Sequence, residues 1–179
     1  MKVVYRKENL IVVDDFFDNF DIDPNDYFSK DLRSRKYDFP DHHDHFIIDQ
    51  YDPTDQVSAY GKIAADKVKS LVDNYPERVA VSSGAHEIKY HDDGLGAIPP
   101  HSDRGHYCGI TVCINREWYR EWGGWNFTFE SDNIKTTEPK FNRAIIILAP
   151  NLHGCTPVWE RDKVRRTMQF FVDDLDDNS

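Results

Sequence analysis

The sequence has 179 residues, of which 39% are hydrophobic, 30% charged and 13% aromatic. This length predicts one domain, residues 1–179, and this composition supplies enough apolar surface for a core, which excludes a multidomain machine and an intrinsically disordered chain. The 32 acidic residues outnumber the 22 basic ones, and the formal net charge of −10 opposes phosphate backbones and anionic lipids, so we expect no nucleic acid and no membrane partner.

The cysteine count and the first residues bear on location. The chain has three cysteines, and its N-terminal residues lack the apolar stretch of an export signal. No apolar run approaches the ~20 residues of a membrane-spanning helix. An odd number of cysteines in a chain without an export signal makes a disulfide framework improbable. We therefore expect free thiols and a cytoplasmic protein, because the cytosol keeps thiols reduced.

In chain order, the first predicted elements are two short strands and a helix. β-Branched stretches at residues 3–5 and 10–13 predict a strand, a turn and a second strand. The acidic and aromatic segment 14–45 is less regular, and its turn signals leave room for a short helix at 25–33. Apolar residues spaced three and four apart predict a long helix at 54–73, with Thr54 as its N-cap and a Tyr-Pro pair after its end.

After this helix, the sequence favours β-structure. Segments rich in β-branched and aromatic residues predict strands at 86–90, 109–114, 125–129, 144–148 and 167–172. Several short strands without alternating helices indicate a mainly β fold, a sandwich or jelly roll with its helix packed outside. We divide the domain into N-terminal strands with a supporting helix, residues 1–85, and a barrel core, residues 86–172.

Candidate metal ligands are found in His-x-Asp pairs. Such a pair places both side chains on one side of an extended segment, but composition alone produces it by chance. The context favours His101/Asp103, because strand-like segments follow it and a third ligand, His153, comes just after the buried-type run 143–152. Two histidines and one carboxylate can occupy one face of an octahedral ion and leave three positions open, as in non-haem Fe(II) oxygenases. The alternative is that His153 is a hydrogen-bonded turn histidine. The other His-x-Asp pairs are His42/Asp44 and His91/Asp93.

The strand predicted near the C-terminus carries a candidate anion-binding pair. Strand alternation places Arg165, Thr167 and Gln169 on one face. Inside an otherwise apolar barrel, a guanidinium and a hydroxyl are costly unless they meet an anion, and arginine binds a carboxylate with two parallel hydrogen bonds. The alternative reading leaves Arg165 facing solvent.

Several segments, taken together and in this order, carry a family resemblance: Tyr90, residues 100–103, Gly123-Gly124, residues 148–157 and residues 165–167. This ordered set resembles the 2-oxoglutarate and Fe(II)-dependent oxygenase superfamily, most closely its prolyl 4-hydroxylase-like branch. The resemblance covers roughly residues 87–172, about half of the chain. It implies a double-stranded β-helix, which is a jelly roll, with helices packed on one side.

The resemblance also implies roles for single residues. His101, Asp103 and His153 would be the iron ligands, Arg165 assisted by Thr167 would bind the distal carboxylate of 2-oxoglutarate, and Tyr90 would line the site. The implied cofactors are Fe(II), 2-oxoglutarate and O₂, with ascorbate as a further candidate. One position departs from the pattern, because Cys113 stands where prolyl hydroxylases often have a tyrosine that hydrogen-bonds this carboxylate. A thiol is a weak donor.

The implied function is a dioxygenase that hydroxylates a prolyl residue in a peptide or protein. Hydroxylation of a free amino acid or small metabolite is an alternative within the family. A non-catalytic β-barrel binding module and a zinc-dependent cupin-like enzyme are alternatives from other classes. A nucleobase dealkylase is disfavoured, since that branch has a second arginine where this sequence has Phe171.

Further segments are candidates for other roles. The tract 42–45, rich in histidine, favours a solvated loop, with adventitious metal binding as the alternative. The resemblance implies that the acidic segment around it, upstream of the barrel, contacts the substrate as a lid. Cys108 and Cys113 are five residues apart, on opposite faces of one strand, so we expect ordinary thiols. Core packing, with a substrate platform as the alternative, is expected of five aromatic residues: Trp118, Tyr119, Trp122, Trp125 and Trp159.

Overall fold

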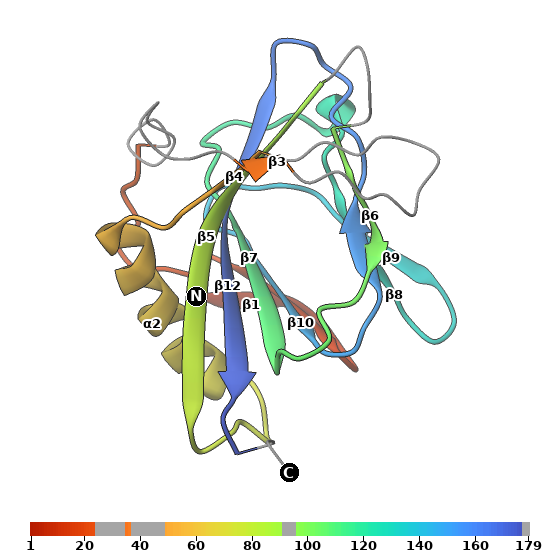
Figure 1. Ribbon diagram of the computed structural model, residues 1–179. Helices are drawn as coiled ribbons and strands as arrows, with labels where there is room; N and C mark the ends of the chain where they lie inside the picture. The colour runs from red at the N-terminus through yellow and green to blue at the C-terminus, as the bar shows by residue number, and fades with distance from the viewer. Residues whose placement is uncertain (24–34, 37–48, 91–95, 177–179) are drawn as a thin grey trace.

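The computed structural model describes residues 1–23, 35–36, 49–90 and 96–176. In this part of the chain, the strands form an eight-stranded and a four-stranded sheet, and all neighbouring strands are antiparallel (Figure 1). The larger sheet has the order β1 (Lys2–Lys7), β2 (Leu10–Asp14), β10 (Ala144–Leu148), β7 (Cys108–Cys113), β12 (Val164–Asp174), β5 (Val79–Lys89), β4 (Asp49–Tyr51), β3 (Arg35–Lys36). The smaller sheet has the order β6 (Ile98–His101), β11 (His153–Cys155), β8 (Asn126–Phe129), β9 (Ile134–Thr137).

This arrangement confirms the predicted mainly β fold of the jelly-roll type. The strands predicted at 86–90, 109–114, 125–129, 144–148 and 167–172 are present as parts of β5, β7, β8, β10 and β12. The sequence did not predict β3, β4, β6, β9 and β11. Two of the four residues of β6 are prolines, which cannot donate to a sheet ladder, and β6 accordingly lies at the edge of the smaller sheet.

The N-terminal strands are part of the larger sheet. The predicted strand, turn and strand are confirmed as β1 and β2, and β2 pairs with β10 in register from Leu10 to Val13. All five residues of β2 are buried. The boundary predicted between residues 85 and 86 falls inside β5, so the N-terminal segment and the barrel core share one hydrogen-bonded sheet.

The helix α2 (Asp55–Lys69) covers the outer face of the larger sheet (Figure 1). Thr54 caps it, because its hydroxyl accepts a hydrogen bond from the backbone N–H of Val57 at 3.3 Å. The predicted helix to residue 73 is wrong at its C-terminus. Both the backbone N–H and the hydroxyl of Ser70 donate to the carbonyl of Lys67, and these bonds close the last turn.

Against α2 lies the main hydrophobic core. Buried helix residues contact the side chains of β7, β10 and β12 that point outwards from the barrel, together with Phe16 and Phe17, which follow β2. The opposite face of the same strands is turned towards the smaller sheet (Figure 1). The eight-stranded sheet therefore has one face that supports the fold and one that faces the barrel interior.

Some expectations lie outside the described residues. These are the helix at 25–33, the pairs His42/Asp44 and His91/Asp93, the tract 42–45 and the lid around it. Within the described residues, no helix is long and apolar enough to cross a membrane.

Candidate active site

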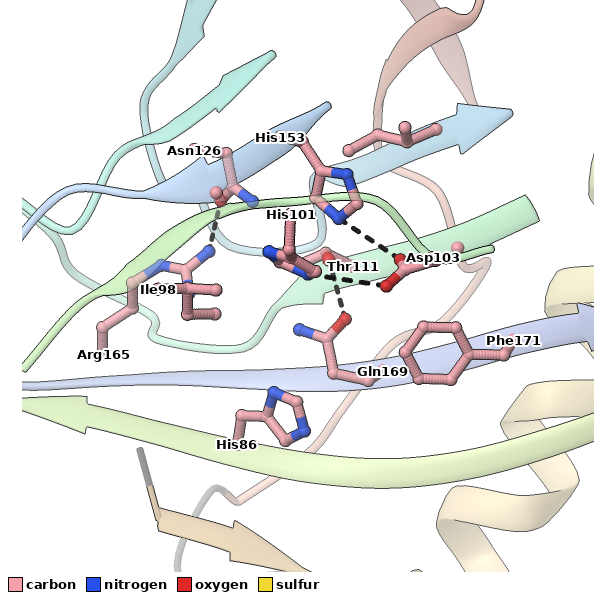
Figure 2. A pocket seen from close by; sticks show the side chains of 13 residues that line it. His86, Ile98, His101, Asp103, Thr111, Asn126, His153, Arg165, Gln169 and Phe171 are labelled. Carbon is pink, nitrogen blue, oxygen red and sulfur yellow. Dashed lines mark hydrogen bonds and ion pairs between the residues drawn. The ribbon is translucent and has the colours of Figure 1, made fainter. Parts of the chain in front are cut away.

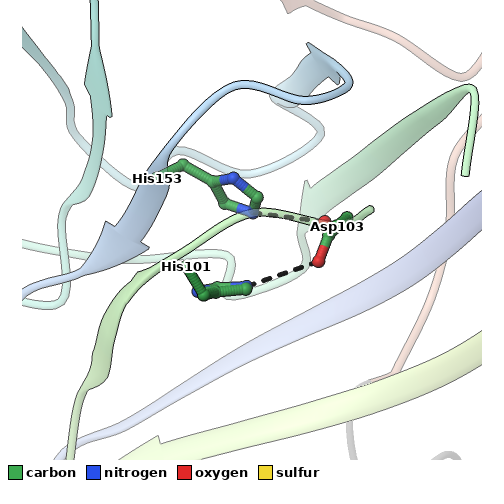
Figure 3. A group of neighbouring side chains, drawn as sticks. All are labelled: His101, Asp103 and His153. Carbon is green, nitrogen blue, oxygen red and sulfur yellow. Dashed lines mark ion pairs between the residues drawn. The ribbon is translucent and has the colours of Figure 1, made fainter. Parts of the chain in front are cut away.

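Three of the predicted site residues meet between the two sheets. His101 ends β6 and His153 begins β11, and the two residues are direct partners in the antiparallel pair. Asp103 follows two residues after the end of β6. Its carboxylate lies between the histidines, with Oδ1 3.4 Å from Nε2 of His101 and Oδ2 3.2 Å from Nε2 of His153 (Figure 3). One ligand atom from each residue lies within 4.8 Å of the others.

The sequence placed His153 in a turn just past a strand, and this is wrong in detail. The strand β10 ends at Leu148, and after a turn His153 opens the new strand β11. Pairing with β6 and β8 on either side fixes its backbone. A histidine on a paired strand is held more firmly than one in a turn, which suits a metal ligand.

Backbone carbonyl groups determine which ring nitrogen of each histidine is available. Nδ1 of His101 lies 2.9 Å from the carbonyl oxygen of Pro99, and Nδ1 of His153 lies 3.0 Å from that of Asn151. A carbonyl oxygen only accepts hydrogen bonds, so each Nδ1 carries a proton and donates it. In the neutral rings, both Nε2 atoms then keep a lone pair, which is the arrangement that metal-binding histidines have.

Asp103 remains ionised in this environment. Burial raises the pKa of its carboxyl group, but hydrogen bonds that the Nε2 atoms of His101 and His153 donate when these rings are protonated outweigh burial and hold the pKa below its usual range. Gly109 on β7 leaves room for this carboxylate, because a Cβ atom at this position would lie 2.9 Å from Oδ2 of Asp103. Two imidazole nitrogens and one carboxylate fit a divalent transition metal such as Fe(II), with positions left open for other ligands.

Arg165 lies inside the barrel, on the face that the strand alternation predicts. Its side chain is 1% exposed, and Nη2 donates to the side-chain oxygen of Asn126. Among the described residues, the Nε–H group has no hydrogen-bond partner, and no carboxylate forms an ion pair with the guanidinium. A buried charge without a counter-ion is costly, so the space beside the guanidinium of Arg165 is suited to binding an anion.

The neighbour Arg166 points to the other side of β12. Its Nε donates to the carboxylate of Glu87 at 2.7 Å. The two adjacent arginines thus differ in their surroundings, since Arg166 has an acidic partner on the outer side of the sheet and Arg165 reaches into the barrel.

The metal-ligand cluster and Arg165 line one and the same cavity (Figure 2). Apolar side chains of Ile98, Ile147 and Phe171 form part of its wall. Four polar residues that the sequence analysis gave no role also line it: His86, Thr111, Asn126 and Gln169. Alternation along β12 could have indicated Gln169, whereas the others depend on how distant strands pair.

Thr167 is on the same face of β12 as Arg165 and Gln169 but is not among the residues that line the cavity. It is fully buried, and its Oγ1 accepts a hydrogen bond from Nε2 of Gln169 at 3.0 Å. The hydroxyl of Thr111 donates to Oε1 of the same glutamine at 2.7 Å. In the sheet, Thr167 is paired with Cys113 of β7 on one side and with His86 of β5 on the other.

His86 is the least satisfied polar group of the cavity. Neither of its buried ring nitrogens has a hydrogen-bond partner among the described residues. Burial, with a further contribution from the positive charge of Arg165, lowers the pKa of His86 to about 4. The ring is therefore neutral at physiological pH, with one N–H donor and one acceptor nitrogen.

Tyr90 does not line this cavity. The guanidinium of Arg161 lies over its ring, 4.9 Å from the centroid, and donates to its hydroxyl at 3.5 Å. The predicted role of Tyr90 in the site stays a prediction, and this placement does not support it. The three cysteines are buried and free, with Cys108 in the core beside α2.

The Gly-Gly turn allows Arg165 to reach the cavity. Gly123 and Gly124 have φ values of 73° and 67°, in the left-handed region that favours glycine. A Cβ atom on Gly124 would lie 2.9 Å from Cδ of Arg165. Among the aromatic residues near this turn, Trp118 packs against the small cluster around Ile88, whereas Trp159 is 54% exposed.

Comparisons with known proteins show similarity in structure rather than in sequence. No protein-family model matches the sequence, and no curated protein matches it. Among solved structures, an oxidoreductase of the 2OG-Fe(II) oxygenase family from Burkholderia pseudomallei superimposes with a TM-score of 0.70 at 11% identity. The match covers 92% of this chain and 85% of that one.

Two further structures show the same fold. A prolyl hydroxylase from Trichoplax adhaerens, in complex with a peptide fragment of the oxygen degradation domain of hypoxia inducible factor, matches with a TM-score of 0.68 and 12% identity, over 93% of this chain and 84% of that one. The alpha ketoglutarate dependent epimerase SnoN from nogalamycin biosynthesis matches with a TM-score of 0.69 and 11% identity, over 95% and 80% of the two chains. Another structure of SnoN is a complex with Fe³⁺ and alpha ketoglutarate, which is 2-oxoglutarate. The chain therefore has the fold of the 2-oxoglutarate and Fe(II)-dependent oxygenases that its sequence resembles.

Proposed function

We propose that this protein is a 2-oxoglutarate- and Fe(II)-dependent dioxygenase that hydroxylates its substrate. The observation that carries the proposal is the single cavity shared by the His101, Asp103 and His153 cluster and by the buried guanidinium of Arg165. A metal site alone fits many enzymes. A metal site beside a buried cation that lacks a described carboxylate partner fits a cosubstrate with a chelating end and an anionic end.

In this proposal, each residue has a definite task. The Nε2 atoms of His101 and His153 and the carboxylate of Asp103 hold Fe(II), and Arg165 binds the distal carboxylate of 2-oxoglutarate. When bound, the iron supplies the activation of O₂ that couples oxidation of 2-oxoglutarate to succinate and CO₂ with hydroxylation of a C–H bond. The apolar wall formed by Ile98, Ile147 and Phe171 limits the access of water, and the rigid strands orient the reactants.

We propose a prolyl residue in a peptide or protein as the substrate. The prolyl 4-hydroxylase-like order of motifs in the sequence supports this, as does the fold shared with the prolyl hydroxylase from Trichoplax adhaerens. The second candidate is a free amino acid or another small molecule, which the equally similar fold of SnoN supports. Ascorbate as a cofactor and a cytoplasmic location stay predictions.

The proposed cofactors can be tested by an anaerobic titration of the metal-free protein. Fe(II) is added first and 2-oxoglutarate second, and the weak visible charge-transfer band of the chelate is followed. We expect a band that needs both additions in the wild-type protein and no band in His153→Ala. With O₂ admitted, the wild-type protein should form succinate from 2-oxoglutarate.

Other outcomes would favour the competing functions. A folded wild-type protein that binds Fe(II) without a band or succinate formation would contradict the proposal and favour a binding module. Tight binding of Zn²⁺ with activity in the absence of iron and 2-oxoglutarate would favour a cupin-like zinc enzyme. Once the band is established, proline-containing peptides and free amino acids can be compared by mass spectrometry for the gain of one oxygen atom.

A further inference from the structure

The unsatisfied imidazole of His86 is unexplained by the fold. Both ring nitrogens are buried, and neither has a hydrogen-bond partner among the described residues. A buried polar group without a partner costs about 1–3 kcal/mol, and such groups in native structures are rare. Its place in the cavity indicates that the missing partner is a bound molecule.

Two other polar residues of this wall already form hydrogen bonds within the protein. Gln169 accepts from the hydroxyl of Thr111 and donates to Thr167, and Asn126 accepts from Arg165. Figure 2 shows His86 rising from β5 towards the side of the cavity where Gln169 and Arg165 lie, with no dashed line to the ring. An incoming ligand therefore finds an N–H donor on His86 that has no competing acceptor.

Charge indicates what kind of ligand group this is. His86 is close enough to Arg165 for the guanidinium charge to act on its ring. A cation beside an N–H donor attracts an acceptor with negative charge. A carboxylate has two oxygens with about four acceptor positions, and the two parallel hydrogen bonds of a bidentate pair with Arg165 fill only two of them. Cys113, the residue across β12 from His86, offers only a weak thiol donor.

We propose that His86 is a second anchor of the cosubstrate, whose ring N–H donates a hydrogen bond to the same distal carboxylate that Arg165 binds. This inference rests on the proposed function, because it assigns a residue to the anionic end of 2-oxoglutarate. It makes the carboxylate site a pair of donors from neighbouring strands, Arg165 on β12 and His86 on β5. The role is one of binding, and His86 holds no metal ion.

The test compares His86→Leu, which removes the donor, with His86→Gln, which keeps an N–H group. In the anaerobic titration with Fe(II), we expect His86→Leu to weaken 2-oxoglutarate binding about tenfold or more, the range of a hydrogen bond to a charged group. His86→Gln should recover most of the affinity, and Fe(II) binding should be unchanged in both variants. Without 2-oxoglutarate, His86→Leu should melt at the same or a higher temperature than the wild-type protein, because it removes an unsatisfied group.

Two controls separate this role from a structural one. His106 hydrogen-bonds Asp173 and does not line the cavity, so His106→Leu should lower the melting temperature and leave 2-oxoglutarate affinity unchanged. The probe 2-oxobutanoate has the chelating end of 2-oxoglutarate but no distal carboxylate. Its weaker binding should be the same in the wild-type protein and in His86→Leu.

The outcomes distinguish failure of this inference from failure of the proposed function. A wild-type band with an unchanged affinity in His86→Leu would overturn the role of His86 and leave the proposed function standing. An equal loss for 2-oxoglutarate and 2-oxobutanoate would also overturn it, since the effect would then lie at the metal end. A wild-type protein without any band would contradict the proposed function, and the role of His86 would fall with it.

Discussion

The two faces of the eight-stranded sheet differ in whether the protein itself satisfies their side chains. On β12, Met168, Phe170 and Val172 are fully buried against the core beside α2, which consists of apolar side chains. On the other face of the same strand, Nε of Arg165 has no partner among the described residues, and neither has the ring of His86 on the adjacent strand β5. The outer face is satisfied by apolar contacts within the protein, whereas the inner face has polar groups that the described residues leave open for a ligand. Stability and ligand binding should therefore respond separately to changes on the two faces.

The largest expected effect on stability comes from the outer face. Phe170→Ala removes a fully buried ring that lies against Phe17, and large-to-small changes of this kind cost about 3–5 kcal/mol. We expect chemical denaturation to show a loss of this size in the free energy of unfolding. The affinity of the remaining folded protein for Fe(II) should stay the same, because Phe170 does not line the cavity.

Phe171→Ala is the matched control for this change. Phe171 is next in the chain but lines the cavity and is only half-buried. Its truncation should cost clearly less stability than that of Phe170. Equal losses would contradict the idea that the two faces of β12 differ in their contribution to the fold.

The next effect, on the inner face, should appear in binding rather than in stability. Arg165→Met replaces the buried cation with an apolar side chain of similar length. It relieves an unpaired charge and leaves Asn126 without its donor, so the free energy of unfolding should change by no more than about 1 kcal/mol. Affinity for 2-oxoglutarate should fall by about 2–5 kcal/mol, as for a truncated partner of a buried charge pair.

The two readouts for this variant are denaturation without ligand and the anaerobic titration. Loss of Fe(II) binding in a folded Arg165→Met protein would contradict the assignment of this residue to the cosubstrate. A loss of several kcal/mol of stability with unchanged 2-oxoglutarate affinity would make Arg165 a structural residue.

The same contrast explains which features the sequence could predict. The strand β12 and the helix α2 follow from local periodicity. The sequence could therefore predict that Arg165 points inwards and that Thr54 caps the helix. The short spacing of His101 and Asp103 also needs no knowledge of the fold. His86 and Asn126 could not be assigned, because their positions depend on pairing with strands far away in the sequence. β5 pairs with β12 across more than 70 residues, as in the pair of His86 with Thr167.

Other parts of the candidate site were predicted only incompletely. The strand β6 was not predicted because two of its four residues are proline, and its pairing with β11 brings His101 opposite His153. Tyr90 ends the predicted strand 86–90 and fits the order of the motifs, but it contacts Arg161, and no local pattern connects these two residues. Local signals thus indicated the ligands, and long-range register determined the cavity around them.

On the inner face, the contribution of His86 to stability should depend on pH. The pKa of His86 is lowered to about 4 in the folded protein, whereas an unfolded histidine titrates near 6.5. Between these values the unfolded chain binds the additional proton, so this contribution to stability is complete above about pH 6.5 and is lost as the pH falls towards 4. The loss amounts to about 3 kcal/mol.

Denaturation of the metal-free protein at pH 7, 5.5 and 4.5 checks this expectation against His86→Leu. The variant should lose less stability than the wild-type protein over this range. Asp103, whose pKa is lowered, loses its contribution only at more acidic pH. His101, whose pKa is raised, loses its contribution as the pH rises above about 6.5, and this change is common to the wild-type protein and the variant. Parallel pH curves for the two proteins would show that the ring of His86 is satisfied in solution by a group such as water.

The smallest expected effect separates two roles for Thr167. A hydroxyl that contacts the carboxylate of 2-oxoglutarate would be worth about 1.5–3 kcal/mol of affinity, whereas one that only holds Gln169 is worth about 0.5–1.5 kcal/mol of stability. Thr167 does not line the cavity and its hydroxyl accepts a hydrogen bond from Gln169, so we expect the second pattern in Thr167→Val. Denaturation should show the loss of stability, and the titration should show an affinity change below about 1 kcal/mol, while Thr167→Ser should retain both properties. A large loss of affinity with unchanged stability would instead place the Thr167 hydroxyl on the cosubstrate, and the inner face would then bind its ligand through the whole Arg165, Thr167 and His86 group.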